Sequence, residues 1–207
     1  MQTALEKPAK SKKEQKRDAI LDAAQELILA SGGSFEIGDL ARKAGISNGL
    51  AYHYFRSKDG VIAGVIDRFY DRYETVVDER MDPEVAWELR ERHRLERVVE
   101  FLFSDPLAPV LFGSLSHRHA VERDMRSQRA MMANAAYNIR SGQQRGQISG
   151  RIDAELAGAA ITGAVRATTM MALSMQPRPA ASKVAAQIWQ LIASAVGLDA
   201  KKATKTT

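Results

Sequence analysis

The 207-residue sequence contains no cysteine. Disulfide-based folds, cysteine-ligated zinc fingers and cysteine nucleophiles are therefore excluded. Long apolar runs are also missing, because Arg166 interrupts the stretch that begins at Leu156, and we expect no membrane-spanning helix. The first residues lack the apolar segment of a signal peptide, so we expect a cytoplasmic protein.

Positive charge is concentrated at the two ends of the chain. The net charge is +5, from 30 Lys and Arg against 25 Asp and Glu. Residues 1–17 carry six cations and two anions, and the last ten residues carry three Lys and one Asp. The body from 18 to 197 is therefore close to neutral and gives no general argument for a polyanionic partner. Hydrophobic residues make up 45% of the chain, which is enough for a packed core.

Apolar residues recur at helical spacing along most of the chain, and no segment alternates over a useful strand length. We predict an all-α fold of about nine helices. Their limits are Glu14 to Gly32, Ser34 to Gly45, Ser47 to Phe55, Ser57 to Val77, Pro83 to Asp105, and the ranges 106–116, 118–145, 153–175 and 180–196. Ser34 is predicted to cap the second helix, with Glu36 in its first turn, and Pro83 to open the fifth.

Three short helices within about 45 residues, joined by a glycine-containing turn, indicate a helix-turn-helix. The turn is Ala44-Gly45-Ile46-Ser47, where Gly45 permits a positive φ and Ser47 caps the third helix. Ala51 and Phe55 are four residues apart and are predicted to face inward. The outward residues are Asn48, Gly49, Tyr52 and His53, with Leu50 beside them. Small and hydrogen-bonding groups of this kind suit entry into a DNA major groove.

The runs Ile20–Ala24, Asp39–Ser47 and Tyr52–Lys58 resemble the TetR (tetracycline repressor) family of bacterial transcription regulators. The motif resemblance covers residues 15–70, and beyond residue 70 it is architectural only. It implies an N-terminal DNA-binding domain followed by a larger domain that dimerises and binds a small effector.

The resemblance assigns DNA contacts to Ser47, Asn48, Gly49, Leu50, Tyr52, His53 and Lys58. Asn48, Gly49 and His53 would approach base edges, and Leu50 a thymine methyl. Tyr52 and Lys58 would hold phosphates, Lys58 from a helix N-terminus whose amides also attract anions. Two residues depart from the family pattern: Glu36 stands where Thr is common, and Ala51 replaces a larger aliphatic residue.

We divide the chain into a flexible basic arm at 1–13, a helix-turn-helix domain at 14–66, an effector-binding and dimerisation domain at 67–197, and a flexible basic tail at 198–207. Small residues recur every four positions near 163, and the last helix is apolar on more than one side. We therefore predict a two-fold four-helix bundle between subunits. Its predicted interface residues are Ala159, Gly163, Ala167, Ile188, Trp189 and Ile192.

Eight methionines are many for this length, and flexible thioethers line adaptable apolar cavities as readily as they fill cores. We predict a pocket for a small, largely apolar effector, lined by Trp87, Phe103, Phe112, Met132, Val165 and Thr168. No cofactor or metal is expected, because cysteine is absent and His117 and His119 lie on different sides of a helix. The resemblance implies a repressor that binds a palindromic operator as a homodimer and is released by the effector.

The alternatives to this prediction are an enzyme, another kind of regulator with the same fold, and a protein-interaction module. Gly113-Ser114-Leu115-Ser116-His117 contains a possible nucleophile and base, but it does not match the G-x-S-x-G elbow and no strand precedes it. No P-loop and no G-x-G-x-x-G motif is present either, so we do not expect an enzyme. The same fold could serve an activator or a ligand-independent regulator. The last alternative is a helical protein-interaction module that does not bind DNA.

Overall fold

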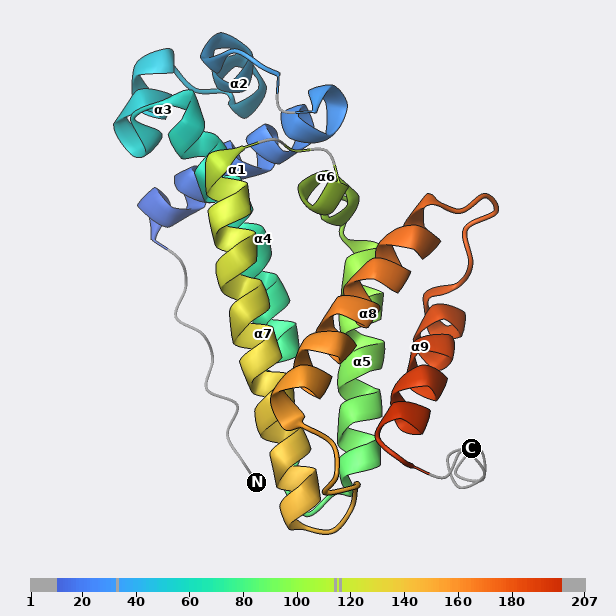
Figure 1. Cartoon of the computed structure of the whole chain (residues 1–207). Helices are drawn as coiled ribbons and strands as arrows, with labels where there is room; N and C mark the ends of the chain where they lie inside the picture. The colour runs from blue at the N-terminus through green and yellow to red at the C-terminus, as the bar shows by residue number, and fades with distance from the viewer. Residues whose placement is uncertain (1–10, 33, 114, 116, 199–207) are drawn as a thin grey trace, which may run out of the picture. The chain divides into compact units, whose positions relative to one another are not determined.

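The computed structural model describes residues 11–32, 34–113, 115 and 117–198, and within these ranges the chain forms helices and no strand. The nine helices are α1 (Lys12–Ser31), α2 (Ile37–Ala44), α3 (Asn48–Phe55), α4 (Lys58–Val77), α5 (Trp87–Ser104), α6 (Leu107–Gly113), α7 (Arg118–Gln144), α8 (Ala154–Ser174) and α9 (Ala181–Ala195), as Figure 1 shows. The predicted all-α fold is confirmed.

The chain divides into two compact units, residues 1–68 and 69–207. The division falls inside α4, which is one continuous helix. In the N-terminal unit, α1, α2, α3 and the first turns of α4 enclose an apolar core that contains Ile20, Leu40 and Val61, all fully buried. Each of these side chains lies on the apolar stripe of its own helix, so the helical period determines which face is buried.

The turn between α2 and α3 forms as the sequence predicts. Gly45 has φ +65°, a left-handed conformation that glycine adopts without steric cost. The N–H groups of Gly45 and Ile46 donate to the carbonyl oxygens of Arg42 and Ala41 at 3.3 and 2.9 Å. These bonds close the end of α2, and Ser47 then begins α3.

Two helix starts in the N-terminal unit differ from prediction. Ser11 caps α1 and forms a reciprocal capping box with Glu14, so the helix begins at Lys12 and the arm cannot extend to residue 13. Residues 1–10 of that arm and 199–207 of the tail lie outside the described residues. Glu36, not Ser34, occupies the N-cap of α2, and the carboxylate in the first turn is that of Asp39.

Helix α5 begins at Trp87, four residues later than Pro83. The carboxylate of Asp82 accepts a 2.9 Å hydrogen bond from the N–H of Glu84, and the carbonyl of Asp82 accepts from Val85 at 3.1 Å. An aspartate that bonds the backbone two residues onward forms a turn, and this turn replaces the predicted first helical turn.

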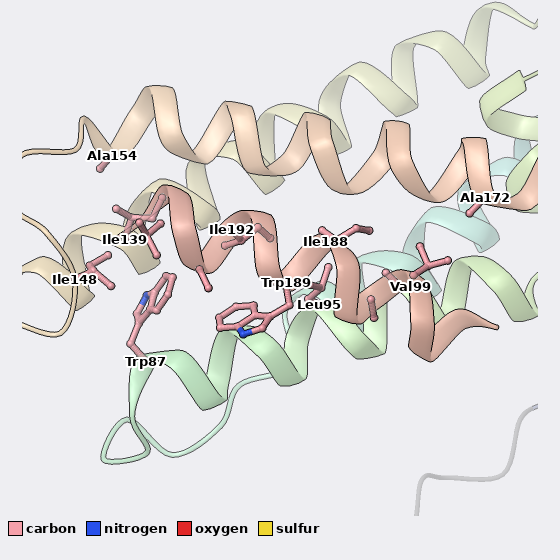
Figure 2. Packing of buried hydrophobic residues seen from close by; sticks show 14 residues of the cluster. Trp87, Leu95, Val99, Ile139, Ile148, Ala154, Ala172, Ile188, Trp189 and Ile192 are labelled. Atoms are coloured by element: carbon pink, nitrogen blue, oxygen red, sulfur yellow. The ribbon is translucent and has the colours of Figure 1, made fainter. Parts of the chain in front are cut away.

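The core of the C-terminal unit is formed by α5, α7, α8 and α9. Figure 2 shows Trp87 and Leu95 of α5 near Trp189 and Ile192 of α9, with Ile139 of α7 beside them. Helices α7 and α8 approach closely at Gly158, where an added Cβ would lie 2.8 Å from backbone atoms of Met132 and Ala136. Glycine at this position therefore sets the separation of the two helices.

Helix α8 has an apolar face that its own chain leaves uncovered. Among the described residues it is the one helix that could cross a membrane by length and composition alone, yet only 22% of its most apolar window is buried. Leu156 and Met171 are 73% and 66% exposed. Arg166 of α8 pairs with Asp124 of α7 at 2.6 Å, so this ion pair joins the two helices within one chain.

Candidate nucleic-acid interface and effector cavity

Helix α3 is held by a cap at its start and by two buried side chains. The hydroxyl of Ser47 accepts a 3.2 Å hydrogen bond from the N–H of Leu50. Ala51 and Phe55 are buried, as their four-residue spacing predicts, and the Arg17 guanidinium lies 5.3 Å from the centre of the Phe55 ring. These contacts hold the inward face of α3 against the domain core and leave its outward face exposed.

The outward face of α3 carries the predicted DNA-contact residues. Asn48, Gly49 and His53 are exposed, Tyr52 is 51% exposed, and Leu50 is half-buried. A Cβ added at Gly49 would meet nothing within 4 Å, so the fold itself does not require glycine there. The structure thus brings these side chains together on one accessible surface.

The start of α4 adds a cation next to this surface. The hydroxyl of Ser57 accepts from the N–H of Gly60 at 3.0 Å and so caps the helix. A Cβ at Gly60 would lie 2.1 Å from the carbonyl oxygen of Phe55, which excludes any larger residue. The Lys58 ammonium lies 5.2 Å from the centre of the Phe35 ring, a distance at which a cation and an aromatic face attract each other.

The four cations between residues 18 and 66 differ in their availability. Lys43 pairs with Glu26 at 2.5 Å, and Arg42 with Asp39 at 2.7 Å. Arg56 is exposed and makes no ion pair within the described part of the chain. Arg56 is not among the residues predicted to contact DNA, although its position between α3 and the cap of α4 places it close to Tyr52 and Lys58 in the sequence.

The C-terminal unit contains a cavity of about 100 Å³. Its apolar lining comprises Tyr73, Val77, Trp87, Leu95, Val98, Met131, Ala135, Ile139, Ile161, Val165, Trp189 and Ile192. Five polar residues complete it: Glu91, Arg94, Asn134, Asn138 and Thr162. A mainly apolar wall with a few polar groups is the usual composition of a small-molecule site.

The charged residues of the cavity are already engaged with one another. The Glu91 carboxylate accepts from Arg94 at 3.3 Å and from the Asn138 side chain at 3.4 Å. Arg94 also donates to the carbonyl oxygens of Val77 and Glu79, at 2.8 and 2.9 Å. The charges of Glu91 and Arg94 therefore neutralise each other within the protein.

Tyr73 contributes a buried aromatic side chain to the cavity lining. Its ring is buried and stacks on Phe101 with centroids 5.6 Å apart. Burial raises the pKa of the Tyr73 phenol to about 12, with Arg166 lowering it and Asp124 raising it by smaller amounts. The side chain is consequently neutral at physiological pH.

The structure places the predicted pocket residues in different surroundings. Trp87 and Val165 line the cavity. Phe103 packs against the core cluster, and Phe112 borders a separate hollow beside Arg166, whose guanidinium lies 4.4 Å from its ring centre. Met132 and Thr168 are half-buried outside the lining. These four residues are not among those that line the cavity, and their role in effector binding stays a prediction.

Half of the predicted interface residues are buried within their own chain. These are Ile188, Trp189 and Ile192, which lie in the core because α9 packs on α5. Gly163 and Ala167 are exposed on α8, and Ala159 is half-buried. The accessible part of the predicted interface is therefore the α8 face.

The structure describes only some of the residues that could bind a metal or act as nucleophile and base. No cluster of three His, Cys, Asp or Glu side chains that could hold a metal ion occurs there. His117 precedes α7 and His119 lies in its first turn. Ser114 and Ser116 fall outside the described residues.

A capped, outward-facing third helix in a helix-turn-helix is the arrangement by which such motifs enter a DNA groove. Residues 20–65 match the family model of bacterial regulatory proteins, tetR family. This part of the chain is therefore similar to bacterial regulators of the tetR family. No curated protein matches the sequence.

Solved structures share the complete fold at low identity. A TetR-like transcriptional regulator from Rhodococcus sp. RHA1 has a TM-score of 0.71 at 22% identity, over 89% of this chain and 97% of that one. FadR from Bacillus subtilis in complex with stearoyl-CoA has a TM-score of 0.66 at 18% identity, over 88% and 98%. RolR in complex with resorcinol has a TM-score of 0.61 at 20% identity, over 93% and 92%. The chain thus has the TetR-family fold over most of its length.

Proposed function

We propose that this protein is a bacterial, cytoplasmic transcription repressor that binds a palindromic DNA operator as a homodimer and is released by a small, largely apolar effector. The observation that carries the proposal is the outward face of α3. Its polar side chains are exposed together, while Ala51 and Phe55 anchor the helix in a domain of the tetR family. A helix presented in this way fits the major groove.

Base readout is assigned to the N-terminal half of α3. Asn48 and His53 offer hydrogen bonds to base edges, Gly49 permits close approach, and Leu50 provides an apolar contact for a thymine methyl. Ser47 adds a hydrogen-bonding group at the start of the helix. These contacts would determine which sequence is bound.

Phosphate binding is assigned to residues around the second half of α3. Tyr52 and Lys58 would each contact a phosphate, and we add Arg56 because it is exposed and without an ion pair in the described chain. Lys12, Lys13 and Lys16 are exposed on the first turns of α1 and extend the same chemistry. Phosphate contacts fix the register of the protein and make binding sensitive to salt.

The homodimer is proposed to form through the exposed apolar face of α8, together with Leu191 of α9, which is 64% exposed. Gly163 and Ala167 leave room for close helix packing, and Leu156 and Met171 would supply apolar area. Such a two-fold interface would present two α3 helices to half-sites separated by about 34–36 Å.

The effector is proposed to bind the cavity of the C-terminal unit. FadR with stearoyl-CoA and RolR with resorcinol are ligand complexes of the same fold, which supports a ligand role for this unit. Helix α4 carries Lys58 at its first position and cavity-lining Val77 at its last. An effector that prefers a different position of α4 would weaken DNA binding by the difference in its affinities for the two states.

Selection of DNA from a random pool tests the proposal. We expect enrichment of a palindrome, and we expect Tyr52→Ala to bind the selected DNA roughly tenfold more weakly through loss of a phosphate contact. Tyr137→Ala is the matched control, because Tyr137 is similarly exposed on α7 in the other unit. Failure to enrich any sequence would favour the helical protein-interaction module instead.

A further inference from the structure

The two tryptophans of the sequence meet at the wall of the cavity. Trp87 begins α5 and Trp189 lies in α9, and their side chains are only 2% and 4% exposed. The ring centroids are 6.4 Å apart with an interplanar angle of 37°. Figure 2 shows the Trp189 ring extending from α9 toward α5, on the side where Trp87 rises from the start of that helix.

The two indole N–H groups differ in their hydrogen bonding. Trp87 Nε1 donates to the backbone carbonyl oxygen of Asn138 at 2.8 Å. Trp189 Nε1 is also buried, but it has no hydrogen-bond partner among the described residues. A buried donor without an acceptor is rare, because it has lost water and gained nothing in exchange.

Two polar side chains of the cavity lining, Glu91 and Thr162, already have hydrogen-bond partners within the protein. The Glu91 carboxylate accepts from Arg94 and Asn138, and the Thr162 hydroxyl donates to the carbonyl oxygen of Gly158 at 2.8 Å. A molecule that occupies the cavity beside Trp189 can bring the missing acceptor. The unpartnered donor thus specifies one functional group of the ligand.

The lining also restricts the charge and size of the ligand. Every guanidinium nitrogen of Arg94 already donates to Glu91, Val77 or Glu79, so no free cation is available for a ligand carboxylate. The cavity volume of about 100 Å³ is of the order of a cavity that holds benzene. A compact, uncharged molecule fits both restrictions.

We propose that the effector is an uncharged, single-ring molecule whose carbonyl or hydroxyl oxygen accepts a hydrogen bond from the Trp189 indole N–H. This assignment rests on the proposed function only in taking the cavity of the C-terminal unit as the effector site. It names the class of ligand and the residue that selects it.

Nuclear magnetic resonance of the full chain with ¹⁵N-labelled tryptophan tests the assignment directly. The sequence has two tryptophans, so the spectrum contains two indole N–H signals, and Trp189→Phe identifies one by its disappearance. The probes are cyclohexanone and methylenecyclohexane, which have nearly the same shape but differ in the oxygen acceptor. We expect cyclohexanone to shift the Trp189 signal downfield, and methylenecyclohexane to leave it without a downfield shift.

Affinity measurements separate the hydrogen bond from the change in side-chain volume. In the wild-type chain we expect cyclohexanone to bind roughly three- to tenfold more tightly than methylenecyclohexane, the ratio that one neutral hydrogen bond gives. In Trp189→Phe we expect that ratio to fall to about one, whatever the enlarged cavity does to both affinities. Cyclohexanecarboxylate is expected to bind more weakly than cyclohexanone.

Equal binding of both neutral probes, with no shift of the Trp189 signal, would overturn the assignment and leave an apolar cavity that does not select an acceptor. Tighter binding of cyclohexanecarboxylate than of cyclohexanone would overturn the assignment of an uncharged ligand. Absence of binding by every probe would also reject the single-ring class. None of these results bears on selection of a palindrome from random DNA, so failure of the assignment and failure of the DNA-binding proposal are distinguishable.

Discussion

The guanidinium of Arg94, in α5, donates a 2.8 Å hydrogen bond to the carbonyl oxygen of Val77, the last residue of α4. Carbonyl groups at the end of a helix have no partner within it, and a cation there also meets the negative end of the helix dipole. Because Arg94 and Val77 both line the cavity, the end of α4 is fastened to α5 at the proposed effector site.

Arg94→Met should lower the free energy of unfolding by about 1–3 kcal/mol, because it removes the cation beside Glu91 and the donor to two carbonyl oxygens. Urea unfolding followed by circular dichroism measures this change. Arg97→Met is the control: its half-exposed side chain pairs with Glu79 and Glu100 at 3.4 and 3.1 Å. Such surface pairs contribute less than about 1 kcal/mol, so equal losses in the two variants would contradict a special role for Arg94.

Gly60→Ala and Gly49→Ala should differ in their effects on stability, although both should weaken DNA binding. The new methyl group at residue 60 would lie 2.1 Å from the Phe55 carbonyl oxygen, so we expect a less stable domain and weaker DNA binding. At residue 49 nothing lies within 4 Å, and alanine should keep or raise stability by up to about 1 kcal/mol. Its methyl group should still weaken binding to the selected operator. Normal operator affinity in a stable Gly49→Ala protein would argue against close approach of α3 to DNA.

Arg56→Gln and Lys58→Gln should each reduce the slope of log affinity against log salt concentration by about one, as loss of one phosphate contact does. Fluorescence anisotropy of labelled operator across a salt series gives the slope. Lys43→Gln is the matched control, because its ammonium already pairs with Glu26. A control slope that drops by as much as the others would mean that the ion pair opens on DNA.

Alkaline pH should destabilise the protein through Tyr73. Its pKa is about 12 in the folded chain and 10.0 ordinarily, so between these values the folded state keeps a proton that the unfolded state has lost. Stability contributed by the neutral phenol is therefore complete below pH 10 and falls as the pH rises to 12. Across this window the wild type should lose about 2–3 kcal/mol more than Tyr73→Phe in urea unfolding. Parallel pH profiles for the two proteins would refute this. Tyr70, whose pKa is raised by burial and by Asp124, titrates in both.

Met171→Glu should convert the proposed dimer to a monomer while leaving each subunit folded, because Met171 is 66% exposed on α8 within its own chain. Sedimentation velocity reports the association state, and circular dichroism the fold. Leu89→Glu on α5, 43% exposed, serves as the control and should remain dimeric. If Leu89→Glu dissociated the dimer and Met171→Glu did not, the interface would lie on α5 and not on α8.

Local signals account for what the sequence predicted well. Gly45, Ser47 and Phe55 act on their own turn or helix, so the helix-turn-helix could be placed before any tertiary contact was known. A local signal also determines that α1 begins at Lys12, because Ser11 and Glu14 have the spacing of a capping box. The prediction that Pro83 begins the fifth helix was wrong, because the preceding Asp82 forms a turn with Glu84.

Long-range packing accounts for what was missed. The period of α9 correctly gives a helix, but only its contact with α5, about ninety residues earlier in the chain, decides that Trp189 faces inward. Asn134 and Asn138 of α7 look like residues of a solvated helix face, yet both line the cavity. Periodicity identifies a buried stripe but not the partner that buries it.

The placement of both indoles at one cavity also gives the protein an internal optical reporter. The sequence has no tryptophan outside positions 87 and 189, so intrinsic emission at tryptophan wavelengths arises entirely from the cavity wall and none of it from the DNA-binding domain. Ligand titrations can therefore be read without any attached dye. An operator labelled with a dye that emits at another wavelength would report DNA release in the same sample. The rates of effector binding and of DNA release could then be compared directly.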